Sequence, residues 1–267
     1  SDLYFSRIYG AGVLMHNEGD GTFADRTAQA GLDGVWNTTG PAFGDIDNDG
    51  DVDLFASSVG GKRHSLLIND GAVHFTEDAL ARGAALATTG QHTGSSVAFG
   101  DYDRDGYLDL WVGEYRTQVA LGDGPSDARL LHNVGAAQPG HFEDVTVKVG
   151  VSLEHVYETI DIEYPIPGVL PLSAGFADLD GDGYPELLLA SDFGCSRMFW
   201  NQGDGTFIDG TVAAGVGSED NGMGSAVGDF DNDGDLDWFV SSIAGTSGKT
   251  GNRLYRYDGS RSFGDAT

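Results

Sequence analysis

The stretch DIDNDGDVD at 45–53 decides the fold of this chain, because three further segments repeat its spacing of acidic residues. The other copies are DYDRDGYLD at 101–109, DLDGDGYPE at 178–186 and DFDNDGDLD at 229–237. Each copy has acidic residues at positions 1, 3, 5 and 9 and glycine at position 6, and an apolar run follows. We call these segments the first to fourth acidic loops. A solvated run of charge would not keep a glycine at one fixed position, so the repetition indicates a structural demand.

A second motif alternates with the acidic loops and is anchored by a phenylalanine. GDGTFADRTAQAGL (19–32) and GDGTFIDGTVAAGV (203–216) are near copies, and weaker copies lie at 74–84, 141–151 and 262–267. The two motifs together recur about every 50 residues, which is typical of a repeat array or a propeller. We assign the repeat units to residues 1–32 (a partial unit), 39–86, 95–151, 173–216 and 223–267.

Each repeat unit reads as four short β-strands. In the second unit we expect strands over 96–99, 108–112, 130–133 and 142–146. The two strands that flank the acidic loop are nearly continuous apolar runs, which favours strands covered on both faces. We expect no amphipathic helix, only single helical turns at 27–31 and 211–215. Four-stranded antiparallel units repeated radially form a β-propeller. We therefore predict an all-β chain with one propeller domain over 1–267, built from four complete blades and a partial one.

Both ends of the sequence fall inside repeat units. DLYFSRIYG (2–10) aligns with DWFVSSIAG (237–245), which places Asp2 at position 9 of an acidic loop. We therefore expect a parent chain with further blades or domains in both directions, and an incomplete ring here. Two insertions, 116–128 and 152–172, break the period. They fit either tolerated surface loops or a binding loop on a rigid scaffold.

The acidic loops carry the donor atoms of a calcium site. Ca²⁺ takes about six to eight oxygen ligands at about 2.3–2.6 Å, and an all-protein oxygen cage suits it better than Mg²⁺. The glycine at position 6 allows the sharp turn around an ion, and converging carboxylates repel each other strongly without one. We predict four Ca²⁺ sites, in which positions 1, 3, 5 and 9 bind through carboxylates and position 7 through its main-chain carbonyl. The predicted ligands are Asp45, Asp47, Asp49, Asp51, Asp53, Asp101, Asp103, Asp105, Tyr107, Asp109, Asp178, Asp180, Asp182, Tyr184, Glu186, Asp229, Asp231, Asp233, Asp235 and Asp237.

Two acidic loops depart from the common pattern. The third loop closes with Glu186, which follows Pro185, where the other loops close with an aspartate. The second loop carries Arg104 at position 4, and we expect this side chain to point outward, away from the carboxylates.

Composition excludes several classes of protein. The chain has 267 residues, with 42 acidic and 14 basic side chains and a formal charge of −28. This charge argues against nucleic acid or an anionic membrane as a partner. No apolar run approaches the length that spans a bilayer. The single cysteine, Cys195, cannot form an internal disulfide, and an aromatic content of 10% argues against disorder.

The alternation of FGDxDxDGxxDL with NxGDGTFxDxT resembles the FG-GAP and VCBS repeats of integrin-α-like β-propellers. GMGSAVGDFDNDGDLDWFVSSI (222–243) looks especially like bacterial relatives of cartilage acidic protein, which carry an ASPIC/UnbV segment after the propeller. No such segment is visible in this sequence. The resemblance implies a calcium-stabilised propeller at an extracellular, cell-surface or periplasmic location. It also implies a role in adhesion or in binding carbohydrate or protein.

No catalytic motif stands out in the sequence. His16 and His132 share one repeat position, which favours structural roles for both. Cys195 reads as a buried, inert thiol, and Trp36 is a candidate exposed ligand contact. Two functions remain open. The first is a noncatalytic, calcium-dependent interaction or adhesion module that binds protein or glycan. The second is a propeller scaffold of a secreted enzyme whose catalytic residues are not recognisable here. The lack of a catalytic motif favours the first.

Overall fold

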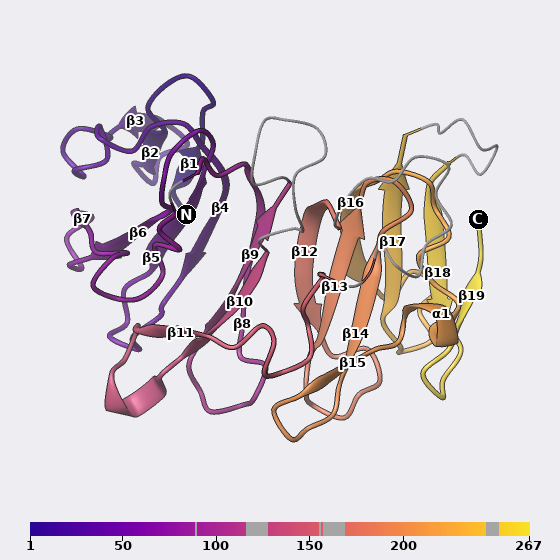
Figure 1. Ribbon diagram of the computed structural model, residues 1–267. Helices are drawn as coiled ribbons and strands as arrows, with labels where there is room; N and C mark the ends of the chain where they lie inside the picture. The colour runs from indigo at the N-terminus through magenta and orange to yellow at the C-terminus, as the bar shows by residue number, and fades with distance from the viewer. Residues whose placement is uncertain (89, 116–127, 155, 157–168, 244–250) are drawn as a thin grey trace.

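The computed structural model shows an all-β chain built from four four-stranded antiparallel sheets and one three-stranded sheet (Figure 1). It describes residues 1–267 except 89, 116–127, 155, 157–168 and 244–250. Each four-stranded sheet keeps its strands in chain order, which is the blade topology of a β-propeller. The three-stranded sheet, the partial blade, contains β1 (Leu3–Phe5), β2 (Val13–Asn17) and β3 (Phe23–Asp25).

The four complete blades follow the partial blade in chain order. The first contains β4 (Thr38–Gly44), β5 (Asp53–Ser58), β6 (Ser65–Asn69) and β7 (Phe75–Glu77). The second contains β8 (Gly94–Gly100), β9 (Asp109–Glu114), β10 (Arg129–Asn133) and β11 (Phe142–Asp144). The third contains β12 (Pro171–Ala177), β13 (Glu186–Ser191), β14 (Arg197–Asn201) and β15 (Phe207–Asp209). The fourth contains β16 (Gly222–Gly228), β17 (Asp237–Ser242), β18 (Arg253–Tyr257) and β19 (Phe263–Asp265).

The predicted fold class and the four strands of the second unit are confirmed. Each acidic loop connects the first strand of a blade to the second, as the repeat pattern required. The helical turn expected at 211–215 is α1 (Thr211–Ala214), and a short 3₁₀ helix, η1 (Gly135–Ala137), also occurs. The insertions at 116–128 and 152–172 lie largely outside the described residues.

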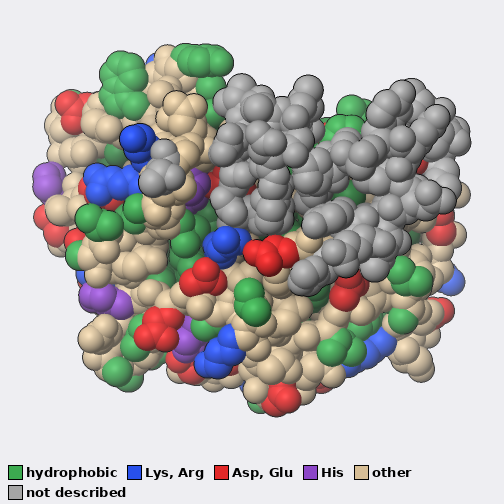
Figure 2. All heavy atoms as spheres, viewed as in Figure 1, with side chains coloured by type: hydrophobic (Ala, Val, Ile, Leu, Met, Phe, Trp, Pro, Cys, Tyr) green, Lys and Arg blue, Asp and Glu red, His purple; other side chains and the backbone are tan. Residues whose placement is uncertain are grey.

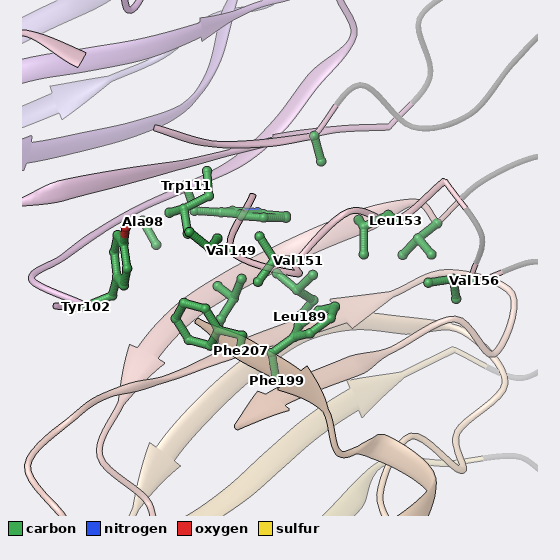
Figure 3. Packing of buried hydrophobic residues seen from close by; sticks show 14 of the residues in the cluster. Ala98, Tyr102, Trp111, Val149, Val151, Leu153, Val156, Leu189, Phe199 and Phe207 are labelled. Carbon is green, nitrogen blue, oxygen red and sulfur yellow. The ribbon is translucent and has the colours of Figure 1, made fainter. Parts of the chain in front are cut away.

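The second strands form the centre of each blade. Every residue of β5, β9 and β13 is buried, which confirms for these second strands that the apolar runs are covered on both faces. The first strands β4, β8, β12 and β16 are only partly buried, so the same prediction is wrong for them. The first strands of successive blades lie side by side, β4 against β8, β8 against β12 and β12 against β16. Between the second and third blades, Trp111 of β9 and Phe199 of β14 belong to one buried apolar cluster (Figure 3). The core is therefore a series of apolar layers between neighbouring blades.

A buried asparagine at the end of the third strand joins each of two blades to the blade before it. Asn133 Nδ2 donates to the carbonyl of Ile46 in the first acidic loop, at 2.8 Å, and to Leu108, at 3.1 Å. Asn201 Nδ2 makes the equivalent bond to Tyr102 in the second loop, at 2.8 Å. Both asparagines are fully buried. These side chains therefore fix the first and second acidic loops against the blades that follow them.

Replacing Asn133 with alanine should destabilise the chain, because two buried carbonyls lose their donor. We expect a loss of about 1–3 kcal/mol in the free energy of unfolding, measured by chemical denaturation. Asn17→Ala is the matched control, since Asn17 holds the same repeat position in the partial blade. Asn17 Oδ1 accepts from Gly19 N as Asn133 Oδ1 accepts from Gly135 N, so the turn contact is lost in both variants. Equal losses in the two variants would contradict a role for the inter-blade bond.

Candidate metal centres

The four acidic loops share one backbone conformation. Position 4 has a positive φ in every loop, between 60° and 73°, and the glycine at position 6 has a φ between 91° and 100°. Glycine reaches such angles without steric cost. The third loop keeps this conformation although Pro185 and Glu186 distinguish its sequence. The conformation is therefore set by the spacing of the motif, and not by the residue at any variable position.

Carboxylates at positions 1 and 5 stabilise each turn by accepting hydrogen bonds from its backbone. In the first loop, Asp45 accepts hydrogen bonds from the backbone N–H groups of Asp49, at 3.2 Å, and Gly50, at 3.0 Å. Asp49 Oδ1 accepts from the N–H of Asp51 at 2.9 Å. In the other three loops too, the N–H of position 6 donates to the carboxylate of position 1, and the N–H of position 7 donates to the carboxylate of position 5. Positions 1 and 5 thus accept hydrogen bonds from the backbone of their own turn, while the position-5 residues are exposed in all four loops. Their role as calcium ligands stays a prediction.

The carboxylate at position 9 is the most buried part of the site. Asp53 begins β5 and accepts from two backbone groups, Ile46 N at 3.3 Å and Asn69 N at 2.9 Å. Asp109 and Asp237 make the same pair of bonds, and all three side chains are at most 1% exposed. Burial raises the pKa of Asp53 and of Asp109 to about 6.

Three buried carboxylate oxygens of the acidic loops accept no hydrogen bond within the described part of the chain. These are Oδ1 of Asp47, Oδ1 of Asp178 and Oε1 of Glu186. Glu186 is fully buried, and burial raises the pKa of this carboxyl to about 8. The ligand atoms of Asp178, Asp180 and Glu186 all lie within 4.8 Å of one another. Buried polar atoms almost always have a partner, so these orphaned oxygens fit a loop whose missing partner is a cation.

Each position-3 carboxylate faces a basic side chain, a pairing that the sequence did not predict. Asp47 Oδ2 lies 3.3 Å from Arg82, and Asp180 Oδ2 lies 2.7 Å from Arg261. In the remaining loops the partners are His132, 3.5 Å from Asp103, and Arg256, 3.4 Å from Asp231. Figure 2 shows basic side chains beside acidic ones over the lower half of one face. No motif in the sequence marks these partners, because they come from parts of the chain outside the loops.

Neighbouring acidic loops also contact each other through position 4. Asn48 Nδ2 in the first loop donates to the carbonyl of Gly106 in the second, at 2.9 Å. Arg104 in the second loop extends to the third, where its guanidinium carbon lies 5.2 Å from the centre of the Tyr184 ring. Arg104 therefore points away from its own carboxylates, and it contacts the next loop.

A separate buried cluster joins the first and second blades. His64 Nε2 lies 3.0 Å from Glu114 Oε1, and His92 Nδ1 lies 2.6 Å from the same oxygen. His92 Nε2 donates to the carbonyl of Leu86, while His64 Nδ1 accepts from the N–H of Ser58. Because His64 Nδ1 accepts this hydrogen bond, it carries no proton, and the proton of the neutral ring is on Nε2. His64 therefore cannot offer Nε2 as a metal ligand. The cluster is therefore a hydrogen-bond network, and not a metal centre.

The sequence contained one signal for this network. Glu114 ends β9 at the position where the first, third and fourth blades have Ser58, Ser191 and Ser242. Despite its burial, hydrogen bonds from His64 and His92 lower the pKa of the Glu114 carboxyl. Burial lowers the pKa of His64.

The single cysteine and the tryptophans differ in their exposure to solvent. Cys195 is buried, its thiol contacts the carbonyl of Phe193, and burial raises its pKa to about 11, so it is an inert thiol. Trp36 is 60% exposed, whereas Trp111 and Trp238 are fully buried. The position-7 residues donate their N–H groups to position 5. Their carbonyls as metal ligands stay a prediction.

Comparison with known proteins places these loops in a repeat family. The family model described as FG-GAP-like repeat matches residues 1–56 and 178–240. Cartilage acidic protein 1 of Homo sapiens is 30% identical over 200 residues, which cover 71% of this chain and 26% of that protein. The Mus musculus protein of the same name is 27% identical over the same shares. The chain thus spans about a quarter of the length of these relatives.

A solved lectin of Agrocybe aegerita, described as recognising non-reducing terminal N-acetylglucosamine, is similar with a TM-score of 0.39. It is 16% identical, and the match covers 99% of this chain and 78% of the lectin chain. Within the described residues no helix has the length and apolar character needed to cross a membrane. The repeated blades, the acidic loops and the matched segments agree, and the chain carries FG-GAP-like repeats.

Proposed function

We propose that the four acidic loops bind Ca²⁺ as structural ions of the propeller. The observation that carries the proposal is the set of buried carboxylate oxygens in the first and third loops that have no hydrogen-bond partner in the described residues. The second and fourth loops share the backbone conformation of these two. Oxygen atoms in this density are the ligands of a hard cation, and an all-protein cage favours calcium. The carboxylates of positions 1, 3, 5 and 9 would hold the ion, and position 7 would add its carbonyl.

Calcium in these loops would stabilise the fold directly. An ion that binds only the folded chain adds about 2.7 kcal/mol at a concentration 100 times its dissociation constant. Several such sites together rival the net stability of a typical domain, about 5–15 kcal/mol. The loops lie between the first two strands of each blade, so an ion there would also keep each strand pair in register.

We further propose that the propeller is a noncatalytic interaction module for protein or glycan at an extracellular, cell-surface or periplasmic site. Two exposed aromatic residues, Tyr9 of the partial blade and Trp36 of the linker that follows it, support this proposal, since aromatic side chains are enriched where proteins bind partners. Tyr9 is 93% exposed and Trp36 is 60% exposed. Tyr9 N donates to Asn37 Oδ1, and both residues hold a positive φ. Such backbone angles in bulky residues cost energy and cluster at functional sites.

A noncatalytic role also agrees with the burial of the histidine–glutamate network. His64 and Glu114 are fully buried and His92 is 4% exposed, so a substrate has no access to them. These groups have the chemistry of acid–base catalysis, but their place between two blades assigns them to blade packing.

Removing calcium should lower the melting temperature of the chain. We expect a decrease of at least 10 °C in excess chelator, since the loss of a few kcal/mol shifts the transition by about 2–8 °C per kcal/mol. The measurement is thermal denaturation followed by circular dichroism, with recovery on adding Ca²⁺ and with Mg²⁺ as the control ion. Identical melting curves with and without chelator would exclude structural calcium.

The affinity of the third loop for calcium should depend on pH up to about 8. The raised pKa of Glu186 means that a proton competes with the ion below this pH, so affinity should rise by up to tenfold per pH unit and then level off. In the ion-free chain this carboxyl stabilises the fold fully below its ordinary pKa of 4.5, and this stability is lost as the pH rises through about 8.

The variant D49N/D105N/D233N leaves only the third loop with its full set of acids, and calorimetric titration reports its affinity. In the matched variant D105N/D182N/D233N only the first loop is intact, where Asp53 has a pKa of about 6. In this second variant the calcium affinity should therefore stop rising about two pH units lower than in the first. The same profile in both variants would contradict the assignment to position 9.

Binding of a glycan or protein ligand should depend on the exposed aromatic pair. We expect Trp36→Ala to remove most binding to a glycan or secreted-protein array and to leave the melting temperature unchanged. Val212→Ala is the control, because Val212 is an exposed apolar residue of the fourth blade, 92% exposed. Binding that survives Trp36→Ala would show that the ligand contacts another surface.

A further inference from the structure

The second acidic loop differs from the other three in the presence of an imidazole among its carboxylates. His132 lies on β10, and its Nδ1 is 3.0 Å from Asp109 Oδ1 and 3.5 Å from Asp103 Oδ2. All three ligand atoms lie within 4.8 Å of one another. The residues at the equivalent position of the other complete blades are Ile68, Trp200 and Arg256.

The distances fit a metal ion with short bonds. Zn²⁺ binds nitrogen at about 2.0–2.1 Å and carboxylate oxygen at about 2.0–2.2 Å in a tetrahedral arrangement, which separates neighbouring ligands by about 3.3 Å. The two distances from His132 Nδ1 to the carboxylates lie on either side of this value. His132 Nδ1 therefore needs little movement relative to either carboxylate to share such an ion, and the two carboxylate oxygens lie within 4.8 Å of each other.

The protonation of His132 permits metal binding, unlike that of His64. His132 Nε2 has no hydrogen-bond partner in the described part of the chain, and the side chain is 25% exposed, so this nitrogen can keep its proton in contact with water. In the ion-free chain Nδ1 donates to Asp109 Oδ1, and a metal ion would take the place of this proton while Nε2 keeps its own. In His64 the N–H of Ser58 occupies the corresponding nitrogen.

The carboxylate of Asp109 is held in place for this role. Asp109 Oδ1 accepts from Asn133 N at 2.9 Å, and its Oδ2 accepts from Tyr102 N at 3.0 Å. Hydrogen bonds of this kind orient a ligand before the metal arrives. The side chain is fully buried, so its position varies little.

We propose that Asp103, Asp109 and His132 form a site for a divalent transition metal of the Zn²⁺ and Co²⁺ class. Imidazole nitrogen suits these ions, whereas calcium takes oxygen ligands. This inference rests on the proposed function in one respect, since both ions use Asp103 and Asp109. Calcium and the transition metal therefore compete for the second loop, while the first, third and fourth loops remain calcium sites.

The test uses the untagged full chain, free of calcium, with Co²⁺ as a spectroscopic probe and Zn²⁺ in calorimetric titration. We expect one site with visible Co²⁺ absorption bands. His132→Ile, which introduces the residue of the first loop, should weaken Zn²⁺ binding at least tenfold and remove the bands. His16→Ile is the matched control, because His16 holds the same repeat position beside only Asp2, at 2.9 Å, and its replacement should leave the site intact.

A second variant tests the site by gain of function. Ile68→His places an imidazole beside Asp47 and Asp53 and should create a second Co²⁺ site in the first loop. Unchanged Zn²⁺ and Co²⁺ binding in His132→Ile would overturn the proposal. Calcium titrations of the same samples report the proposed function separately. A wild-type chain that binds no Ca²⁺ contradicts that function, and the comparison of wild type with His132→Ile still decides the transition-metal site.

Discussion

The carboxylate that begins the second strand of each blade is the contact on which the rest of the structure depends. In the first blade, Asp53 accepts one N–H from the start of the acidic loop and one from the end of the third strand. One side chain thus ties three parts of a blade together and is buried in doing so. Burial of an acid is unfavourable unless its charge is balanced. A cation in the loop, as proposed, would balance the charge of this buried carboxylate.

The same constraint extends from one blade to the next. Asn133 and Asn201 donate to carbonyls in the loop of the preceding blade, and Asn48 donates from one loop to another. A loop that changes shape would disturb these bonds as well as its own turn. The loops therefore belong to the packing between blades, and they are not independent appendages of the sheet edge. These bonds fix the first and second loops, while the conformation that all four loops share follows from the spacing of the motif.

The sequence predicted what is local and repeated, and it missed what is distant and occurs once. The strands, the loops and the burial of the second strands follow from spacing and apolar runs. Arg82 and Arg261 were missed because they reach Asp47 and Asp180 from 35 and 81 residues away, with no shared motif. Glu114 was missed although it replaces a serine found in three other blades. That departure from the repeat was the one readable sign of its network with His64 and His92.

The basic partners change the meaning of the net charge of −28. Each position-3 aspartate uses one oxygen to meet an arginine or histidine, as Asp47 meets Arg82 through Oδ2 while its Oδ1 stays without a partner among the described residues. An arginine at the rim of a loop lowers the repulsion among the acids, but it cannot reach the buried oxygens that face the interior of the turn. Only a small ion of high charge can contact several of them at once. The surplus of acid is therefore arranged in two layers, an outer one balanced by the protein itself and an inner one that a metal ion would balance.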